Sequence, residues 1–141
     1  MHINNLTAPP ESTITFHIIY TVGTVQYLTV FVRSLLHYSQ CRYVLVSNHC
    51  TEQEDAYLQH FCEQDQRLSF IRLPTDEKMW PHGQTLDYLY ARTDSEYFCF
   101  MDSDIFATRP FMADFLARLA DSAGVFTGTA TWHLEEEQIV S

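Results

Sequence analysis

The sequence predicts an α/β fold of three layers, in which helices cover both faces of a mainly parallel β-sheet. Short apolar, β-branched segments alternate with amphipathic segments along most of the 141 residues, and this alternation is typical of repeated βα units. Apolar residues make up 46% of the chain and aromatic residues 14%, which is enough for a packed core in one domain. Connections between parallel strands are expected to be right-handed.

Five segments have the apolar, β-branched composition of strands, and the first two contain TITFHIIY and YVLVS. We expect strands at residues 13–20, 43–47, 68–73, 96–101 and 123–129. The fourth segment is apolar without interruption from Tyr97 to Met101. Such a run is typical of a strand buried on both faces, so we expect it at the centre of the sheet.

Four segments carry apolar residues at helical spacing and are expected to form helices. Their inner faces are Leu28, Phe31, Val32 and Leu35; Leu58, Phe61 and Cys62; Leu86, Leu89 and Tyr90; and Met112, Phe115, Leu116 and Leu119. Thr51 and Glu54 have the spacing of a capping box at the start of the second helix. Pro110 suits the first turn of the fourth helix.

The remaining segments divide the chain into one domain and two ends. Residues 1–12 are polar and are expected to be a loose lead-in, and residues 132–141 to be an acidic tail. The domain itself is expected to span residues 13–131. Within it, residues 74–83 contain two prolines and a glycine among charged residues, which predicts a loop before the third helix.

The charge balance excludes several classes of partner. The chain has 18 acidic and 8 basic residues, a formal net charge of −10, whereas nucleic acids and anionic membrane surfaces require a basic footprint. No stretch has the length and composition of a membrane span or a signal peptide. The cysteines are widely spaced and form no CxxC pair, so we expect neither zinc nor a disulfide framework. A cytoplasmic protein with reduced thiols is therefore predicted.

The fourth expected strand ends on two carboxylates, Asp102 and Asp104, within FMDSDIF. Ligands of open α/β sheets bind at the carboxyl ends of the strands. Two acids separated by one residue in extended chain point to the same side, where they would repel each other and resist desolvation. A divalent cation with oxygen ligands relieves both problems. The sequence therefore predicts a metal-assisted ligand site at this strand end.

These features resemble the nucleotide-sugar-binding half of a glycosyltransferase with the GT-A fold, similar to the large inverting family 2 group. The matching segments are YTVGT (20–24), SNHCTEQE (47–54), HGQTLDYLYART (82–93) and FMDSDIF (100–106), the last of which matches a DxD motif. The resemblance covers roughly residues 13–131. It implies a metal-dependent enzyme that binds a nucleotide-diphosphate sugar and transfers the sugar to an acceptor, which could be a glycan, a lipid or a protein.

The resemblance also implies roles for individual residues. Asp104 would hold Mn²⁺ or Mg²⁺, and Asp102 would contact the ribose or the water shell of the metal. The remaining substrate-binding residues would be Thr21, Val22, Gly23 and Asn48 at the nucleoside, and His82 and Gly83 at the diphosphate. Asn48 stands where the family usually has an acid, and it could instead cap the helix that follows. No catalytic base is identified.

Two other functions stay open at the level of sequence. A phosphohydrolase of the haloacid dehalogenase type also carries a DxD at a strand end, although it expects Thr or Val where Phe106 stands. A non-catalytic nucleotide-sugar-binding domain is the second alternative. In GT-A enzymes the acceptor groove and the base come from a C-terminal half, so we expect the chain to be incomplete there and a poor transferase alone. The sheet edge left open would favour self-association or a partner.

Overall fold

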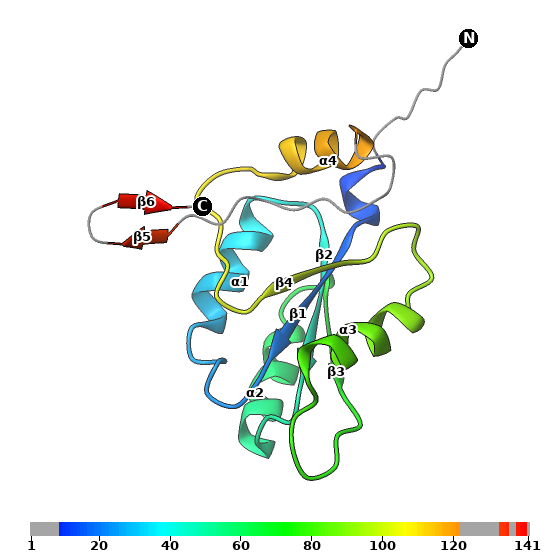
Figure 1. Cartoon of the computed structure of the whole chain (residues 1–141), viewed down its shortest axis with the longest axis vertical. Helices are drawn as coiled ribbons and strands as arrows, with labels where there is room; N and C mark the ends of the chain where they lie inside the picture. The colour runs from blue at the N-terminus through cyan, green and yellow to red at the C-terminus, as the bar shows by residue number, and fades with distance from the viewer. Residues whose placement is uncertain (1–8, 122–132, 136–137, 141) are drawn as a thin grey trace.

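A computed structural model describes residues 9–121, 133–135 and 138–140 (Figure 1). Strands and helices alternate as β1 (Thr15–Tyr20), α1 (Leu28–His37), β2 (Arg42–Ser47), α2 (Glu52–Cys62), β3 (Leu68–Arg72), α3 (His82–Ala91), β4 (Cys99–Asp102) and α4 (Met112–Asp121). A short 3-10 helix, Glu11–Thr13, precedes β1. The expected strand at 123–129 lies outside the described residues. None of the helices in the described ranges is long and apolar enough to cross a membrane.

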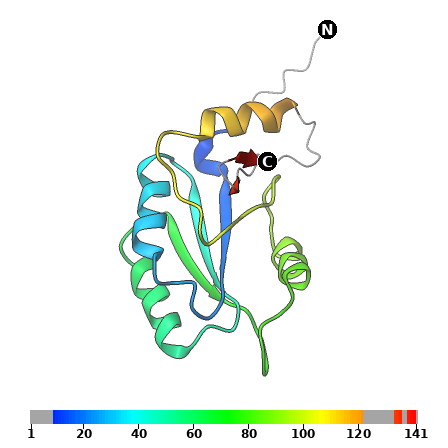
Figure 2. The same ribbon diagram turned by 60° about the vertical axis from the view of Figure 1, so that its left-hand side comes forward.

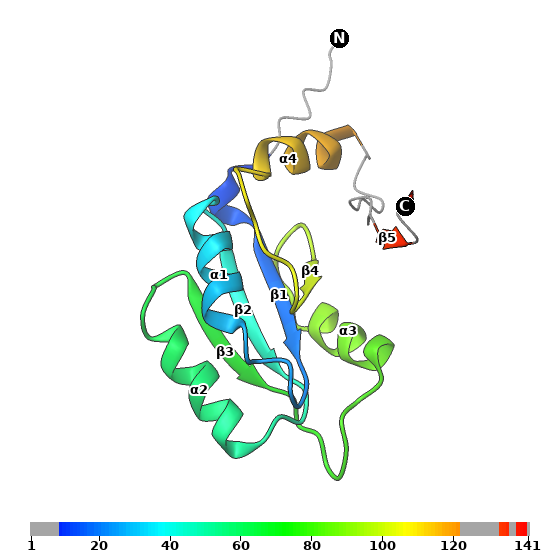
Figure 3. The ribbon, with the colours of Figure 1, turned by 90° about the vertical axis from the view of Figure 1, so that its left-hand side faces the viewer.

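The four main strands form one parallel sheet in the order β3-β2-β1-β4. Strand β1 pairs with β2 from Thr15↔Arg42 to Tyr20↔Ser47, and with β4 up to Ile19↔Asp102. Helices α1 and α2 cover one face of the sheet and α3 covers the other (Figures 2 and 3). The three-layer α/β/α arrangement with a parallel sheet is confirmed, and these four strands all run toward the same end of the sheet.

The main core lies between the sheet and helices α1 and α2. The burial of β1 alternates along the strand, so that Phe16, Ile18 and Tyr20 enter this core. The same cluster contains Leu28, Val32 and Leu35 of α1, Leu58 and Phe61 of α2, and Met112 and Leu119 of α4. A smaller cluster of Val46, Leu73 and Leu89 lies on the α3 side. The sheet is therefore buried more deeply on its α1 and α2 face.

Strand β4 differs from the sequence-based expectation. Among the described strands it pairs only with β1, and the residue Phe100 is 39% exposed. The prediction that this strand is buried on both faces is therefore wrong. Its predicted central position is not tested, because the strand expected at 123–129 lies outside the described residues. Contacts between rings explain part of the apolar run. Phe98 and Phe100 belong to a row of rings that also contacts His17, His82 and Tyr90.

Three helix starts test the local sequence signals. The capping box of α2 is confirmed: Thr51 Oγ1 accepts from the Glu54 N–H at 3.1 Å, and Glu54 Oε1 accepts from the Thr51 N–H at 2.9 Å. Pro110 lies before α4 rather than in its first turn, because the first helical bond runs from the Phe115 N–H to the Phe111 carbonyl. Helix α3 begins at His82, so the preceding loop ends at Pro81 and is shorter than expected.

The segment expected to be an acidic tail also contains regular structure. Strands β5 (His133–Glu135) and β6 (Gln138–Val140) pair with each other in antiparallel orientation. They form a sheet separate from the parallel one. No local signal in this acidic, short-stranded segment had indicated a strand.

A buried amide joins the loop before α3 to the end of β2. The Trp80 N–H donates to Asn48 Oδ1 at 2.9 Å, and Asn48 Nδ2 donates to the Trp80 carbonyl at 3.0 Å. At the other end of the loop, His49 Nδ1 lies 2.8 Å from Thr75 Oγ1. The alternative in which Asn48 caps α2 is wrong, because Thr51 occupies the cap. Asn48 instead holds the Trp80 end of this loop at the end of β2, and His49 holds the Thr75 end.

We expect Asn48→Ala to lower the free energy of unfolding by about 1–3 kcal/mol, because the N–H and C=O of Trp80 lose their partners in a partly buried setting. Urea denaturation measures this change. The control is Gln53→Ala on the exposed surface of α2, which should alter the unfolding free energy by less than about 0.5 kcal/mol. Equal stability of the two variants would show that the Asn48 contacts contribute nothing.

Candidate functional site

The parallel register gathers four loops at one edge of the sheet. Tyr20 lies beside Ser47, and Ile19 lies beside Asp102, so the loops that follow β1, β2 and β4 begin at the same level. The loop after β3 reaches this edge through its contacts with Asn48. The residues predicted from the sequence as ligand contacts therefore belong to one end of the molecule.

The two acids at the end of β4 face solvent. Asp102 is the last residue of β4, and Asp104 lies in the turn that follows; both are exposed. Within the described residues neither carboxylate has a hydrogen-bond or ion-pair partner, and no three His, Cys, Asp or Glu side chains are placed together to hold a metal ion. Two solvated carboxylates supply hard oxygen ligands of the kind that Mg²⁺ and Mn²⁺ accept.

The chain just beyond these acids is held by helix α1. The Ala107 N–H donates to Ser34 Oγ at 2.8 Å. The ring of Phe106 stacks on that of Phe31, with 5.5 Å between the ring centroids. These contacts set the path of the backbone while Asp102 and Asp104 stay exposed.

The loop after β1 is a turn closed by its own hydrogen bonds. Thr24 Oγ1 accepts from the Thr21 N–H at 2.9 Å and donates to the Thr21 carbonyl at 2.8 Å. Gly23 has a φ of 87°, a conformation that favours glycine. Its N–H donates to Glu54 Oε2 at 2.8 Å. The exposed fraction of Val22 is 60%, so this turn presents an apolar side chain to solvent.

The other predicted contacts occupy different settings. Asn48 is 3% exposed, and both atoms of its amide face the Trp80 peptide group. His82 is exposed, with its ring centroid 6.0 Å from that of Phe100. Gly83 lies in the first turn of α3, where no atom would meet an added Cβ within 4 Å. Nothing in the described residues requires glycine at this position.

Sequence reasoning identified Glu54 only as half of a capping box. The structure adds a second partner, since the Gly23 N–H donates to the other carboxylate oxygen. Partial burial raises the pKa of Glu54, but the hydrogen bonds from Thr51 and Gly23 outweigh that effect and hold the pKa below its usual value. The carboxylate is thus kept ionised between two loops. No pattern in the sequence indicated the Gly23 contact.

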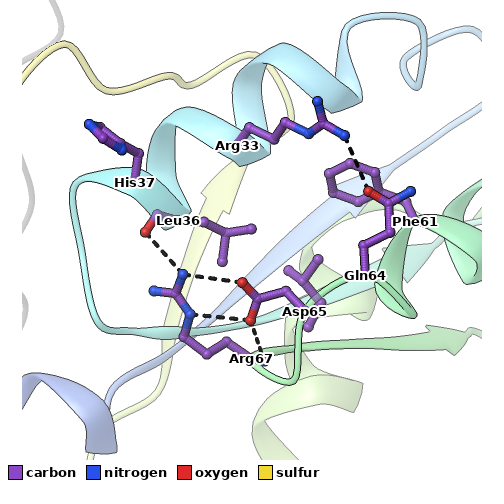
Figure 4. A pocket seen from close by; sticks show the side chains of 8 residues that line it. Arg33, Leu36, His37, Phe61, Gln64, Asp65 and Arg67 are labelled. Carbon is purple, nitrogen blue, oxygen red and sulfur yellow. Dashed lines mark hydrogen bonds and ion pairs between the residues drawn. The ribbon is translucent and has the colours of Figure 1, made fainter.

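A surface hollow of about 430 Å³ lies between the ends of α1 and α2 and the start of β3. It is lined by Arg33, Leu36, His37, Phe61, Gln64, Asp65, Arg67 and Leu68. Arg67 donates to the Leu36 carbonyl at 3.0 Å and forms an ion pair with Asp65, as Figure 4 shows. Arg33 donates to Gln64 at 3.2 Å. These polar groups form hydrogen bonds and an ion pair with one another and with the last turn of α1. The hollow is therefore part of the packing contact between α1 and the end of α2.

Comparison with known proteins relates this geometry to a family. The family model described as glycosyl transferase family 2 matches residues 17–139. Among solved structures, the chain is similar to the crystal structure of S. aureus TarS 1–349, with a TM-score of 0.58 and 19% sequence identity over 77% of this chain and 32% of that one. The chain therefore spans about a third of that structure. A comparison with curated proteins finds no sequence match.

The structural similarity bears on the fold alone and confirms the predicted GT-A type. The family match is more extensive, because it begins within β1 and includes β2, β3 and the strand that ends on Asp102. It thus contains every loop of the carboxyl edge described above. The chain belongs to glycosyl transferase family 2.

Proposed function

We propose that this chain forms the donor side of a glycosyltransferase, which binds a nucleotide-diphosphate sugar through a divalent cation for transfer of the sugar to an acceptor. The observation that supports this proposal is the pair of solvent-facing carboxylates, Asp102 and Asp104, at the carboxyl end of β4. In open α/β sheets this edge is where ligands bind. Membership of family 2 favours sugar transfer over the phosphohydrolase alternative.

The charges explain why the donor would need a cation. The chain carries a formal net charge of −10, and a diphosphate approaching Asp102 and Asp104 would add further negative charge at the same place. Mg²⁺ is usually bound by one or two carboxylates together with substrate phosphates and water, so two carboxylates are a sufficient contribution from the protein. When bound, the cation would stabilise the charge that develops on the departing nucleoside diphosphate.

The remaining residues would orient the donor. The turn of Thr21, Val22 and Gly23 would lie against the nucleoside, because it stands at the end of β1 and exposes the apolar side chain of Val22. His82 and Gly83 would border the diphosphate from the first turn of α3, where free backbone N–H groups favour anions. Asn48 would act through Trp80, whose peptide group it holds.

We expect Asp104→Asn to weaken binding of a nucleoside diphosphate in the presence of Mn²⁺ by roughly tenfold or more, which corresponds to about 1.4 kcal/mol. The reason is the loss of one anionic oxygen ligand of the cation. Calorimetric titration with a panel of nucleoside diphosphates and nucleotide sugars, with Mn²⁺ and with EDTA, measures the effect. The fold should survive, since Asp104 lies in an exposed turn.

The matched control for this measurement is Asp114→Asn in α4, which removes the same charge from an exposed position. Helix α4 lies near the end of the sheet where β1 begins (Figure 1), whereas Asp102 is the last residue of β4, level with the end of β1. The control should bind as the parent chain does. If Asp104→Asn binds with Mn²⁺ as tightly as the parent, the metal assignment is incorrect.

We also expect the loop before α3 to become ordered when the donor binds. Residues 76–79 are exposed, and closure over phosphates would protect their amides from hydrogen exchange. The Trp80 amide is the internal control, because Asn48 already accepts its hydrogen bond in the ligand-free chain. Exchange measured with and without nucleoside diphosphate and Mn²⁺ tests this prediction. Equal exchange of residues 76–79 in both states would contradict it.

A further inference from the structure

The carboxylate of Glu54 connects two loops of the proposed donor site. Oε1 accepts from the Thr51 N–H at 2.9 Å, and Oε2 accepts from the Gly23 N–H at 2.8 Å. The first bond is local and belongs to the start of α2, whereas the second joins residues 31 positions apart. One side chain therefore serves both as a helix cap and as a tertiary contact.

The contact with Gly23 is well placed to orient a whole turn. The turn from Thr21 to Thr24 is closed internally by the Thr24 hydroxyl and by the Thr24 N–H, which donates to the Thr21 carbonyl at 3.1 Å. A turn closed by internal hydrogen bonds keeps its own shape, and its orientation depends on the bonds that connect it to the rest of the chain. One additional bond at Gly23 then restrains the orientation of the turn relative to α2.

We propose that Glu54 is a positioning residue, which holds the turn from Thr21 to Thr24 in the orientation that faces the nucleoside of the donor. This inference rests on the proposed function. It deepens that function by assigning a role to a side chain outside the predicted contacts. Glu54 touches neither the cation nor the reacting atoms, and it acts through the Gly23 backbone.

The chemistry of the side chain makes the role specific to a carboxylate. Each of the two oxygens accepts one backbone N–H, from Thr51 and from Gly23. A glutamine has the same length but only one acceptor oxygen, and its amide N–H₂ would face a second N–H donor. Glu54→Gln can therefore satisfy one of the two loops and not both.

Thr51→Ala is the matched control. It removes the hydroxyl that accepts from the Glu54 N–H and so weakens the same helix start. It leaves the Glu54 carboxylate, the Thr51 N–H and the Gly23 N–H in place. Any effect that arises only from a weaker α2 terminus should therefore appear in Thr51→Ala as well as in Glu54→Gln.

Two measurements on the full chain test the inference. The first is hydrogen exchange of the Gly23 amide by NMR without ligand, which should be roughly threefold to tenfold faster in Glu54→Gln, as expected for the loss of one hydrogen bond, and unchanged in Thr51→Ala. The second is the affinity, with Mn²⁺, for the tightest-binding member of a panel of nucleoside diphosphates. It should fall by a similar factor in Glu54→Gln alone.

The outcomes separate this inference from the function on which it rests. Equal Gly23 exchange in the two variants overturns it, and so does an equal loss of affinity in both, because Glu54 would then be only a helix cap. If the unmodified chain binds none of the nucleoside diphosphates, the proposed function fails. The exchange of the Gly23 amide then decides alone. Faster exchange in Glu54→Gln but not in Thr51→Ala supports the contact of Glu54 with the turn, and equal rates in both variants overturn it.

Discussion

The pairing of β1 with a parallel neighbour on each side is the constraint on which the rest of the structure depends. Its register with β2 and β4 brings Tyr20, Ser47 and Asp102 to one edge, and its alternation directs Phe16 and Ile18 into the core. Because side chains alternate with a period of two, a slip of one residue would turn the buried face of β1 away from α1 and α2. The register thus couples the stability of the core to the assembly of the loops.

The loop after β2 supports its neighbours at this edge. Through Asn48 it holds Trp80, through His49 it contacts Thr75, and through Glu54 at the start of α2 it holds Gly23. The acids after β4 are supported separately, by contacts of the following residues with α1. The proposed donor site therefore has two supports, one on the nucleoside side and one on the metal side. Neither support involves the carboxylates of Asp102 and Asp104.

The acidic character of the chain fits the exposure of the proposed metal ligands. Asp102 and Asp104 are exposed at the end of β4, so water can stabilise both charges before any ligand arrives. A buried pair would have required a permanent partner. In the proposed function, the exposed arrangement would let the cation and the diphosphate complete the site together. Phe100 of β4 lies shortly before these acids in the chain, and its ring lies near that of His82 on α3.

The sequence alone determined the alternation of strands and helices, the capping box at Thr51 and the acid pair after an apolar strand, because each depends on spacing within a few residues. Tertiary structure decided the rest. The place of β4 beside β1 depends on strand order, which periodicity does not encode, and its apolar run reflects packing among rings. The partners of Asn48 and Glu54 lie 32 and 31 residues away. Contacts at such separations form only when the parallel sheet brings the loops together, so local spacing cannot predict them.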